Sequence, residues 1–229
     1  GSDTTLYVNT SYKSDPEVAR LLKTADFRRA LSLGIDRDQL NAAFWLGVGT
    51  PGSAVPDDTM PQNPGPEWRA KWSVLDIGQA NALLDKVGLN KKDSEGFRLR
   101  GDNGQRLRLK VEAVQAFLPW PKQTEMIVDQ WRKIGIDAQV QELERNLAFT
   151  RDNGNENQMI TWANDGSEML FLFPRHALPV DAAESHMGMA FAKWYSSKGT
   201  AGKKPDDPEM IRAFNLFRDA FGMKEEDRV

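Results

Sequence analysis

The sequence has 229 residues, 40% of them apolar and 28% charged, with a formal net charge of −3 at pH 7. A chain of this length buries a sizeable core, as one large domain or two small ones. It contains no cysteine, which excludes disulfides, thiolate catalysis and cysteine-ligated zinc. The slightly acidic balance argues against a nucleic-acid partner, and no apolar run approaches the roughly 20 residues that cross a bilayer.

Two details of the composition need an explanation. Seven tryptophans accompany only three tyrosines, and tryptophan serves both core packing and stacking on ligands. Gly1 and Ser2 are interpreted as a cloning scar, and no charged and then apolar signal segment follows them. We therefore expect the chain to be a trimmed part of a longer protein.

The first quarter of the chain is predicted to form one strand and then helices. A short β-rich run at 5–10 precedes Asp15-Pro16, a pair that is typical of a helix start. Apolar residues spaced by three, four and seven then predict a helix from Ala25 and a second helix that begins after Asp36.

The next stretch, 47–72, is rich in proline and almost without periodicity. This pattern predicts a long irregular excursion with Trp68 and Trp72 as anchors. Asp76 begins a capping-box pattern, and the apolar positions after it predict a helix that Gly88 ends.

Residues 97–114 are predicted to form a β-hairpin, because both arms alternate apolar and polar residues around a turn at 101–104. The apolar side chains share one face. The opposite face carries the basic residues Arg98, Arg100, Arg106, Arg108 and Lys110. We interpret this basic face as a solvated surface, with a binding patch as the alternative.

The remainder of the chain alternates helices and strands. The expected elements are a helix after Pro119-Trp120-Pro121, a strand from Ile136 to Val140, a polar helix at 142–152, a strand at 158–163, a helical turn at 169–173, and helices at about 184–196 and 208–221. Ile127, Trp131 and Ile134 are expected to point inward, and Gly135 to lead into the strand. The alternation predicts an α/β fold, a mixed sheet with flanking helices.

Several segments match a known family in its own order. DFRRALSLGIDRDQLN, at 26–41, combines the two predicted helices with the turn between them. It is followed by LLDKVGL, by IVDQWRKIGIDAQVQ and by WANDGSE, which runs from Trp162 to Glu168. Together these segments resemble the family 5 extracellular solute-binding proteins, the receptors of ABC importers for oligopeptides, dipeptides, nickel chelates, opines and some oligosaccharides. The resemblance covers nearly the whole chain.

The resemblance implies one lobe of a two-lobed, class II periplasmic-binding-protein-like fold, with residues 1–229 as the C-terminal lobe. Members of the family enclose their ligand between this lobe and an N-terminal lobe, which is absent from this sequence. The resemblance further implies a small-molecule or peptide ligand, an ABC transporter membrane permease as partner, and a periplasmic or other extracytoplasmic location. No enzymatic activity and no cofactor are expected.

Four residues are candidates for ligand binding. The resemblance assigns Asp165 to the ligand's α-amino group, which a partly desolvated carboxylate can hold by a charge-assisted hydrogen bond; capping of the turn before Met169 is the alternative. Trp162 is either a cleft residue or a core residue, and Asn164 is a candidate for hydrogen bonds to the ligand. Trp120, between two prolines, is the best candidate for stacking, with a structural plug at the hinge or lobe surface as its alternative.

Three other possibilities follow from the residues around these candidates. Peptide-binding members often continue with an acidic residue and proline, whereas Glu168 is followed here by Met169, and the later segments look more like members that take oligosaccharides. A glycoside hydrolase-like enzyme would pair Asp165 with Glu168. A protein-binding sensory module would use the basic hairpin face.

His176 and His186 lack metal-ligand spacing, so we expect no metal site.

Overall fold

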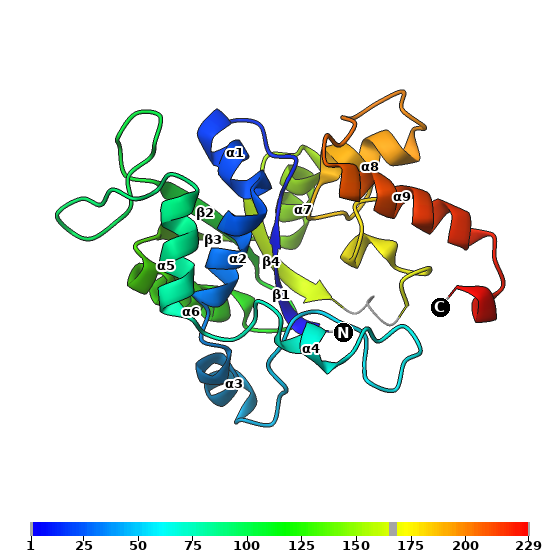
Figure 1. The fold of residues 1–229 in the computed structure, drawn as a ribbon, viewed down its shortest axis with the longest axis horizontal. Helices are drawn as coiled ribbons and strands as arrows, with labels where there is room; N and C mark the ends of the chain where they lie inside the picture. Colours follow the sequence, from blue (N-terminus) through cyan, green and yellow to red (C-terminus); the bar gives the residue numbers. More distant parts are fainter. Residues whose placement is uncertain (1, 165–168, 229) are drawn as a thin grey trace.

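The structure is a computed structural model, and it describes residues 2–164 and 169–228. Within these residues, a four-stranded sheet in the order β1-β4-β2-β3 forms the centre of the fold. The strands are β1 (Ser2–Val8), β2 (Arg108–Val114), β3 (Asp137–Leu143) and β4 (Met159–Asn164). β2 is parallel to β3 and β4, whereas β1 is antiparallel to β4. This mixed sheet with flanking helices confirms the predicted α/β fold (Figure 1).

Four of the five helices before β2 begin where the sequence predicts, whereas the short helix at 66–70 lies in the stretch predicted to be irregular. They are α1 (Pro16–Lys23), α2 (Ala25–Leu33), α3 (Arg37–Trp45), α4 (Pro66–Ala70) and α5 (Ile77–Lys86). The carboxylates of Asp15, Asp36 and Asp76 accept hydrogen bonds from backbone N–H groups in the first turns of α1, α3 and α5. These N–H groups have no partner inside the helix, so the capping carboxylates stabilise each start.

The helices after β2 differ from the prediction at some boundaries. They are α6 (Trp120–Trp131), α7 (Arg145–Asn153), α8 (Met189–Ser196) and α9 (Pro208–Phe221), with the short 3₁₀ turns η1 (Arg132–Ile134), η2 (Pro174–His176) and η3 (Glu225–Asp227). α7 starts later than predicted because Glu142 and Leu143 extend β3, where they pair with β2. Residues 169–173 form a hydrogen-bonded turn, and α8 begins only at Met189. α8 and α9 lie together at one end of the molecule, opposite the loops between α5 and β2 (Figure 1).

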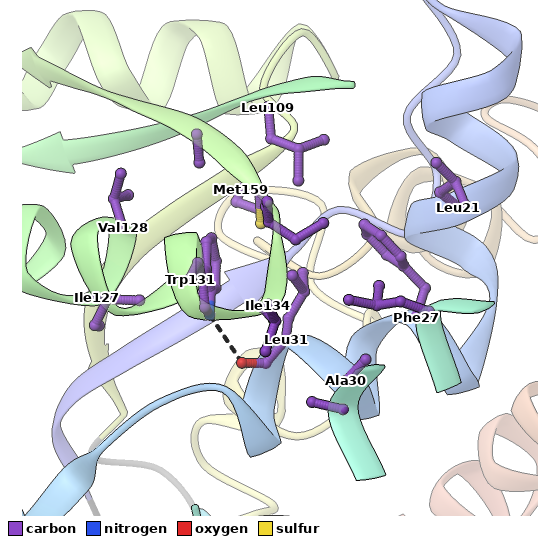
Figure 2. Packing of buried hydrophobic residues seen from close by; sticks show 14 of the residues in the cluster. Leu21, Phe27, Ala30, Leu31, Leu109, Ile127, Val128, Trp131, Ile134 and Met159 are labelled. Carbon is purple, nitrogen blue, oxygen red and sulfur yellow. Dashed lines mark hydrogen bonds between the residues drawn. The ribbon is translucent and has the colours of Figure 1, made fainter. Parts of the chain in front are cut away.

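The larger hydrophobic core joins α1, α2, α5 and α6 to one face of the sheet. Trp131 is fully buried there, and its Nε1 donates a hydrogen bond to the carbonyl oxygen of Leu31 at 2.8 Å, which ties α6 to α2 (Figure 2). Leu109 and Met159 bring β2 and β4 into the same cluster. The predicted inward positions on α6, including Trp131, are therefore confirmed. No helix in the described ranges is long and apolar enough to cross a membrane.

The proline-rich excursion has one tryptophan anchor. Trp72 packs against the larger core, and the guanidinium of Arg29 lies 4.7 Å from its ring centre. Trp68, on α4, is 43% exposed, with the Lys71 ammonium 3.8 Å from its ring centre. The prediction of an anchor is confirmed for Trp72 and is wrong for Trp68, because the short helix α4 buries none of its residues.

The basic face of the hairpin is the predicted solvated surface only in part: Arg108 and Lys110 are exposed, whereas the other three residues are buried or half-buried. The turn and the antiparallel contact between Leu99 and Arg106 are present, but Arg98 is only 1% exposed. Its guanidinium donates to the Ile134 carbonyl at 2.8 Å, to Asp85 at 2.6 Å and to the Asn81 side chain at 2.6 Å. Arg98 therefore fixes the hairpin to α5 and η1, since these partners satisfy a charge that would otherwise be costly to bury.

The other hairpin arginines are largely neutralised. Arg100 forms ion pairs with Asp15 and Asp102, and Arg106 forms ion pairs with Asp93 and Glu95. The hydrogen bond from Arg100 lowers the pKa of Asp15 below its usual value. Carboxylates of the same chain therefore occupy the guanidinium groups of Arg100 and Arg106, while Arg108 and Lys110 stay exposed.

Candidate ligand-binding site

The predicted site residues lie near the carboxyl ends of the parallel strands. In open α/β sheets, ligands bind in the crevice outside this edge. Val114 ends β2 and Leu143 ends β3, and both belong to a second buried cluster that also contains Trp162 of β4. The segment 115–119 and the start of α7 follow β2 and β3 directly. Their side chains are therefore placed around the same edge of the sheet.

Four aromatic side chains meet at this edge, and we call them the aromatic cluster: Phe117, Trp120, Phe149 and Trp162. The ring centre of Trp162 lies 4.5 Å from that of Trp120, 5.0 Å from that of Phe149 and 6.2 Å from that of Phe117. Such tilted and edge-on contacts stabilise ring pairs beyond the burial of their area. The cluster brings together β4, α6, α7 and the segment after β2.

The two predicted tryptophans are the buried part of this cluster. Trp120 is 1% exposed, and its Nε1 donates a hydrogen bond to the carbonyl oxygen of Asp3 at 3.0 Å. Trp162 is 8% exposed. By contrast, Phe117 is 76% exposed. The ring that the cluster presents to solvent is thus that of Phe117, which sequence reasoning missed because it precedes the proline pair without any periodic pattern.

Asn164, the last residue of β4, is held in place by the segment that follows the site. It is 3% exposed, and its Nδ2 donates a hydrogen bond to the carbonyl oxygen of His176 at 3.1 Å. Its Oδ1 is buried without a hydrogen-bond partner among the described residues. A buried acceptor that lacks a partner costs about 1–3 kcal/mol. Asn164 therefore has an acceptor still to satisfy, at the strand end where a ligand is expected.

Two predicted acidic residues fall outside the structure's description. Asp165 and Glu168 lie in 165–168, beyond the described residues. The ligand-amine role of Asp165, its capping alternative and the carboxylate pair of an enzyme all stay predictions.

A basic residue that sequence reasoning also missed covers the aromatic cluster. Arg145, the first residue of α7, is exposed, and its guanidinium carbon lies 5.7 Å from the ring centre of Phe117, 5.3 Å from that of Phe149 and 5.2 Å from that of Trp162. A cation over ring faces is attracted by their negative electrostatic potential. A signal was available in principle, because Arg145 follows the carboxyl end of a parallel strand.

A buried pair of a histidine and an aspartate lies next to the aromatic cluster. His186 Nδ1 is 2.8 Å from the Oδ2 atom of Asp152, and both side chains are buried. The His186 ring stacks on Phe149 at a centre distance of 5.6 Å. In the described part of the chain, no group of three or more histidine, aspartate and glutamate side chains is arranged to hold a metal ion.

One groove among the described residues starts close to this edge, because Asp3 and Thr4 line it and the neighbouring Ser2 pairs with Asn164. It has a volume of about 690 Å³ and lies along β1, α3 and the beginning of the excursion, with Thr5, Leu6, Arg37 and Trp45 among its lining residues. None of the predicted site residues lines it. The groove and the aromatic cluster therefore have different lining residues, although Asp3 of the groove accepts the hydrogen bond from Trp120.

The mixed four-stranded sheet with flanking helices matches the fold of periplasmic binding proteins. The sequence pattern of the bacterial extracellular solute-binding proteins, family 5 (middle region), matches residues 2–172. The chain belongs to this family. Among curated protein sequences, none matches the chain.

Solved structures show the same fold. The oligopeptide-binding protein OppA is 25% identical, with a TM-score of 0.80, over 96% of this chain and 36% of its own. MelB of Agrobacterium fabrum, in complex with stachyose, is 17% identical, with a TM-score of 0.72, over 99% of this chain and 34% of its own. A Thermotoga maritima oligopeptide-binding protein with bound mannohexaose is 18% identical, with a TM-score of 0.65, over 99% of this chain and 40% of its own. The chain thus spans 34–40% of the length of these proteins.

Proposed function

We propose that this chain is the C-terminal lobe of the substrate-binding subunit of an ABC importer, which captures an oligopeptide or a similar polar solute between two lobes. The observation that carries the proposal is the aromatic cluster beside Asn164, at the carboxyl edge of a solute-binding family fold. Coverage of only 36% of the OppA chain supports a single lobe of a larger receptor. An N-terminal lobe and a membrane permease are the partners in this proposal.

The mechanism is closure around a hinge. Ligand bridges the two lobes and selects the closed conformation, which then docks on the permease. In this lobe, Asp165 holds the ligand's α-amino group, Asn164 accepts a hydrogen bond from the ligand, and Trp162 and Trp120 form the base beneath the ligand. The extracellular designation of the family supports a periplasmic or other extracytoplasmic location.

An oligosaccharide is the second candidate ligand. The exposed ring of Phe117 favours it, because a flat aromatic face stacks on the apolar face of a sugar ring. The complexes of MelB with stachyose and of the Thermotoga protein with mannohexaose support the same candidate.

The two rival classes have less support. The family and the named relatives are described as binding proteins, which argues against a glycoside hydrolase-like enzyme. A protein-binding sensory module would need a free basic face on the hairpin, yet Arg98 is buried and Arg100 and Arg106 are ion-paired.

Thermal unfolding of the protein with the whole of its chain tests the proposal. At about 100 times its dissociation constant, a ligand adds about 2.7 kcal/mol to the stability of the folded state. We expect oligopeptides or oligosaccharides to raise Tm by several degrees and to be recovered chemically intact. Turnover of the added solute, or no shift with either class, would contradict the proposal.

Two further comparisons sharpen this test. Replacement of Asp165 by alanine is expected to weaken peptide binding, and an unchanged peptide affinity would support the capping role of Asp165 or a sugar ligand. The isolated lobe is expected to bind weakly, because the contacts of the other lobe are missing. A calorimetric affinity of residues 1–229 equal to that of the whole protein would refute the two-lobe mechanism.

A further inference from the structure

Arg145 differs from every other arginine in residues 2–164 and 169–228. The others each form at least one hydrogen bond or ion pair, whether to a carboxylate or to a backbone carbonyl oxygen. Arg145 forms neither with any described residue. Its contacts are three of the four rings of the aromatic cluster: Phe117, Phe149 and Trp162. The guanidinium therefore lies against aromatic rings, and its N–H groups have no acceptor among residues 2–164 and 169–228.

Other arginines that lie over aromatic rings also have an oxygen partner, which Arg145 lacks among the described residues. Arg29 lies over Trp72 and pairs with Asp26 at 2.8 Å. Arg106 lies over Phe97 and pairs with Asp93 at 2.6 Å. Arg175 lies over Phe173 and pairs with Glu184 at 3.0 Å, and Arg228, over Phe171, donates to the carbonyl oxygens of Met223 and Phe221. In this protein, stacking on a ring normally accompanies an oxygen partner for the N–H groups.

The acidic side chains next to Arg145 are already occupied. Oε2 of Glu144 accepts hydrogen bonds from the backbone N–H groups of Asn146 and Leu147 and caps α7. Asp152, on the same helix, pairs with His186. The positive charge at the site is thus not neutralised by α7 itself.

We propose that Arg145 is a specificity-determining residue that binds a carboxylate of the ligand, an inference that rests on the proposed binding function. The planar guanidinium presents pairs of N–H donors that match the two oxygens of a carboxylate. The contacts with the rings restrict the guanidinium, so less conformational freedom is lost when a ligand binds. Phe117, the exposed ring beneath it, offers apolar contact to the part of the ligand that bears the carboxylate.

Two sources of carboxylate fit this chemistry: the C-terminal group of a peptide and the acid group of a uronic sugar. Calorimetric affinities of the full-length protein distinguish the two sources. The probes are trialanine and trialanine amide for one source, and trigalacturonate and the neutral trisaccharide raffinose for the other. For the source that is used, we expect the acid to bind at least about tenfold more tightly than its neutral counterpart, as a charge-assisted hydrogen bond implies.

Variants then assign this preference to Arg145. We expect Arg145→Gln to reduce the ratio of acid to neutral affinity to about one, with neutral probes still bound. Arg145→Lys is expected to keep part of the preference, because it keeps the charge and loses the fork. Arg132→Gln, a matched exposed arginine that pairs with Asp129, is expected to leave the ratio unchanged.

The possible failures are separable. Equal binding of acid and neutral probes by the unmodified protein, or an unchanged ratio in Arg145→Gln, overturns the role of Arg145 and leaves the binding function standing. Equal loss of both probes in Arg145→Gln, together with a lower Tm, assigns Arg145 to packing and also overturns the inference. Binding of none of the four probes removes the binding function on which the inference rests.

Discussion

The replacement of Trp120 separates a structural role from a ligand contact. Its indole is 1% exposed, packs 4.5 Å from the ring centre of Trp162, and donates a hydrogen bond to Asp3 on β1. Truncation of a buried tryptophan to alanine costs about 3–5 kcal/mol. For a chain of this length, that loss corresponds to a fall in Tm of roughly 6–20 °C.

A second variant separates the contribution of the Trp120 ring from that of its N–H donor. Trp120→Phe keeps a ring against Trp162 but loses the N–H donor, so we expect it to cost about 1–2 kcal/mol. Urea unfolding of both variants, followed by circular dichroism, gives the two free energies of unfolding. A loss below about 1 kcal/mol for Trp120→Ala, together with loss of ligand binding, would refute the structural reading of Trp120 and support direct stacking on a ligand.

Three further variants test the fold in the same unfolding assay. Arg98→Met should cost about 3 kcal/mol, because it leaves the carbonyl oxygen of Ile134 and other acceptors without a donor; a neutral effect would contradict the anchoring role of Arg98. Asp15→Asn keeps the helix cap but removes the charge next to Arg100. Since the folded-state pKa of Asp15 is lowered, the variant should be less stable than the unmodified protein at neutral pH, and this difference in free energy of unfolding should vanish as the pH falls below about 4. A difference that persists at low pH would show that the charge of Asp15 is not its cause. Gly135→Ala should destabilise by more than about 1 kcal/mol, because φ is +77° and a Cβ would lie 2.8 Å from a backbone oxygen; full stability would contradict the constraint.

The parts of the fold that depend on local sequence could be predicted from it. The helix starts at Asp15, Asp36 and Asp76 need only a short side chain and the next turn of backbone. The turn at Gly135 could be predicted because glycine readily adopts the positive φ found there. Both kinds of signal lie within a few residues, so tertiary contacts do not change them.

The parts that depend on distant contacts could not be predicted. Alternation places Arg98 on the polar face of a hairpin, but its partners Asn81, Asp85 and Ile134 come from α5 and η1 and withdraw it from solvent. No local pattern indicates a contact of this kind.

The candidate site shows the same limit. Trp162 and Asn164 could be selected because they end a strand, and a resemblance to a family pointed to them. Phe117 and Arg145 join them only when β2, β4 and α7 are packed side by side. The roles of all four residues in binding stay predictions.

The most direct test of the binding function is mass spectrometry of what the protein retains. The protein with the whole of its chain is incubated with a mixed library of oligopeptides and oligosaccharides, separated from free solute, and unfolded. Capture by a solute-binding lobe predicts that a narrow set of one class is released at about one molecule per protein, chemically intact. Release of cleaved solutes, or retention of none, would contradict it.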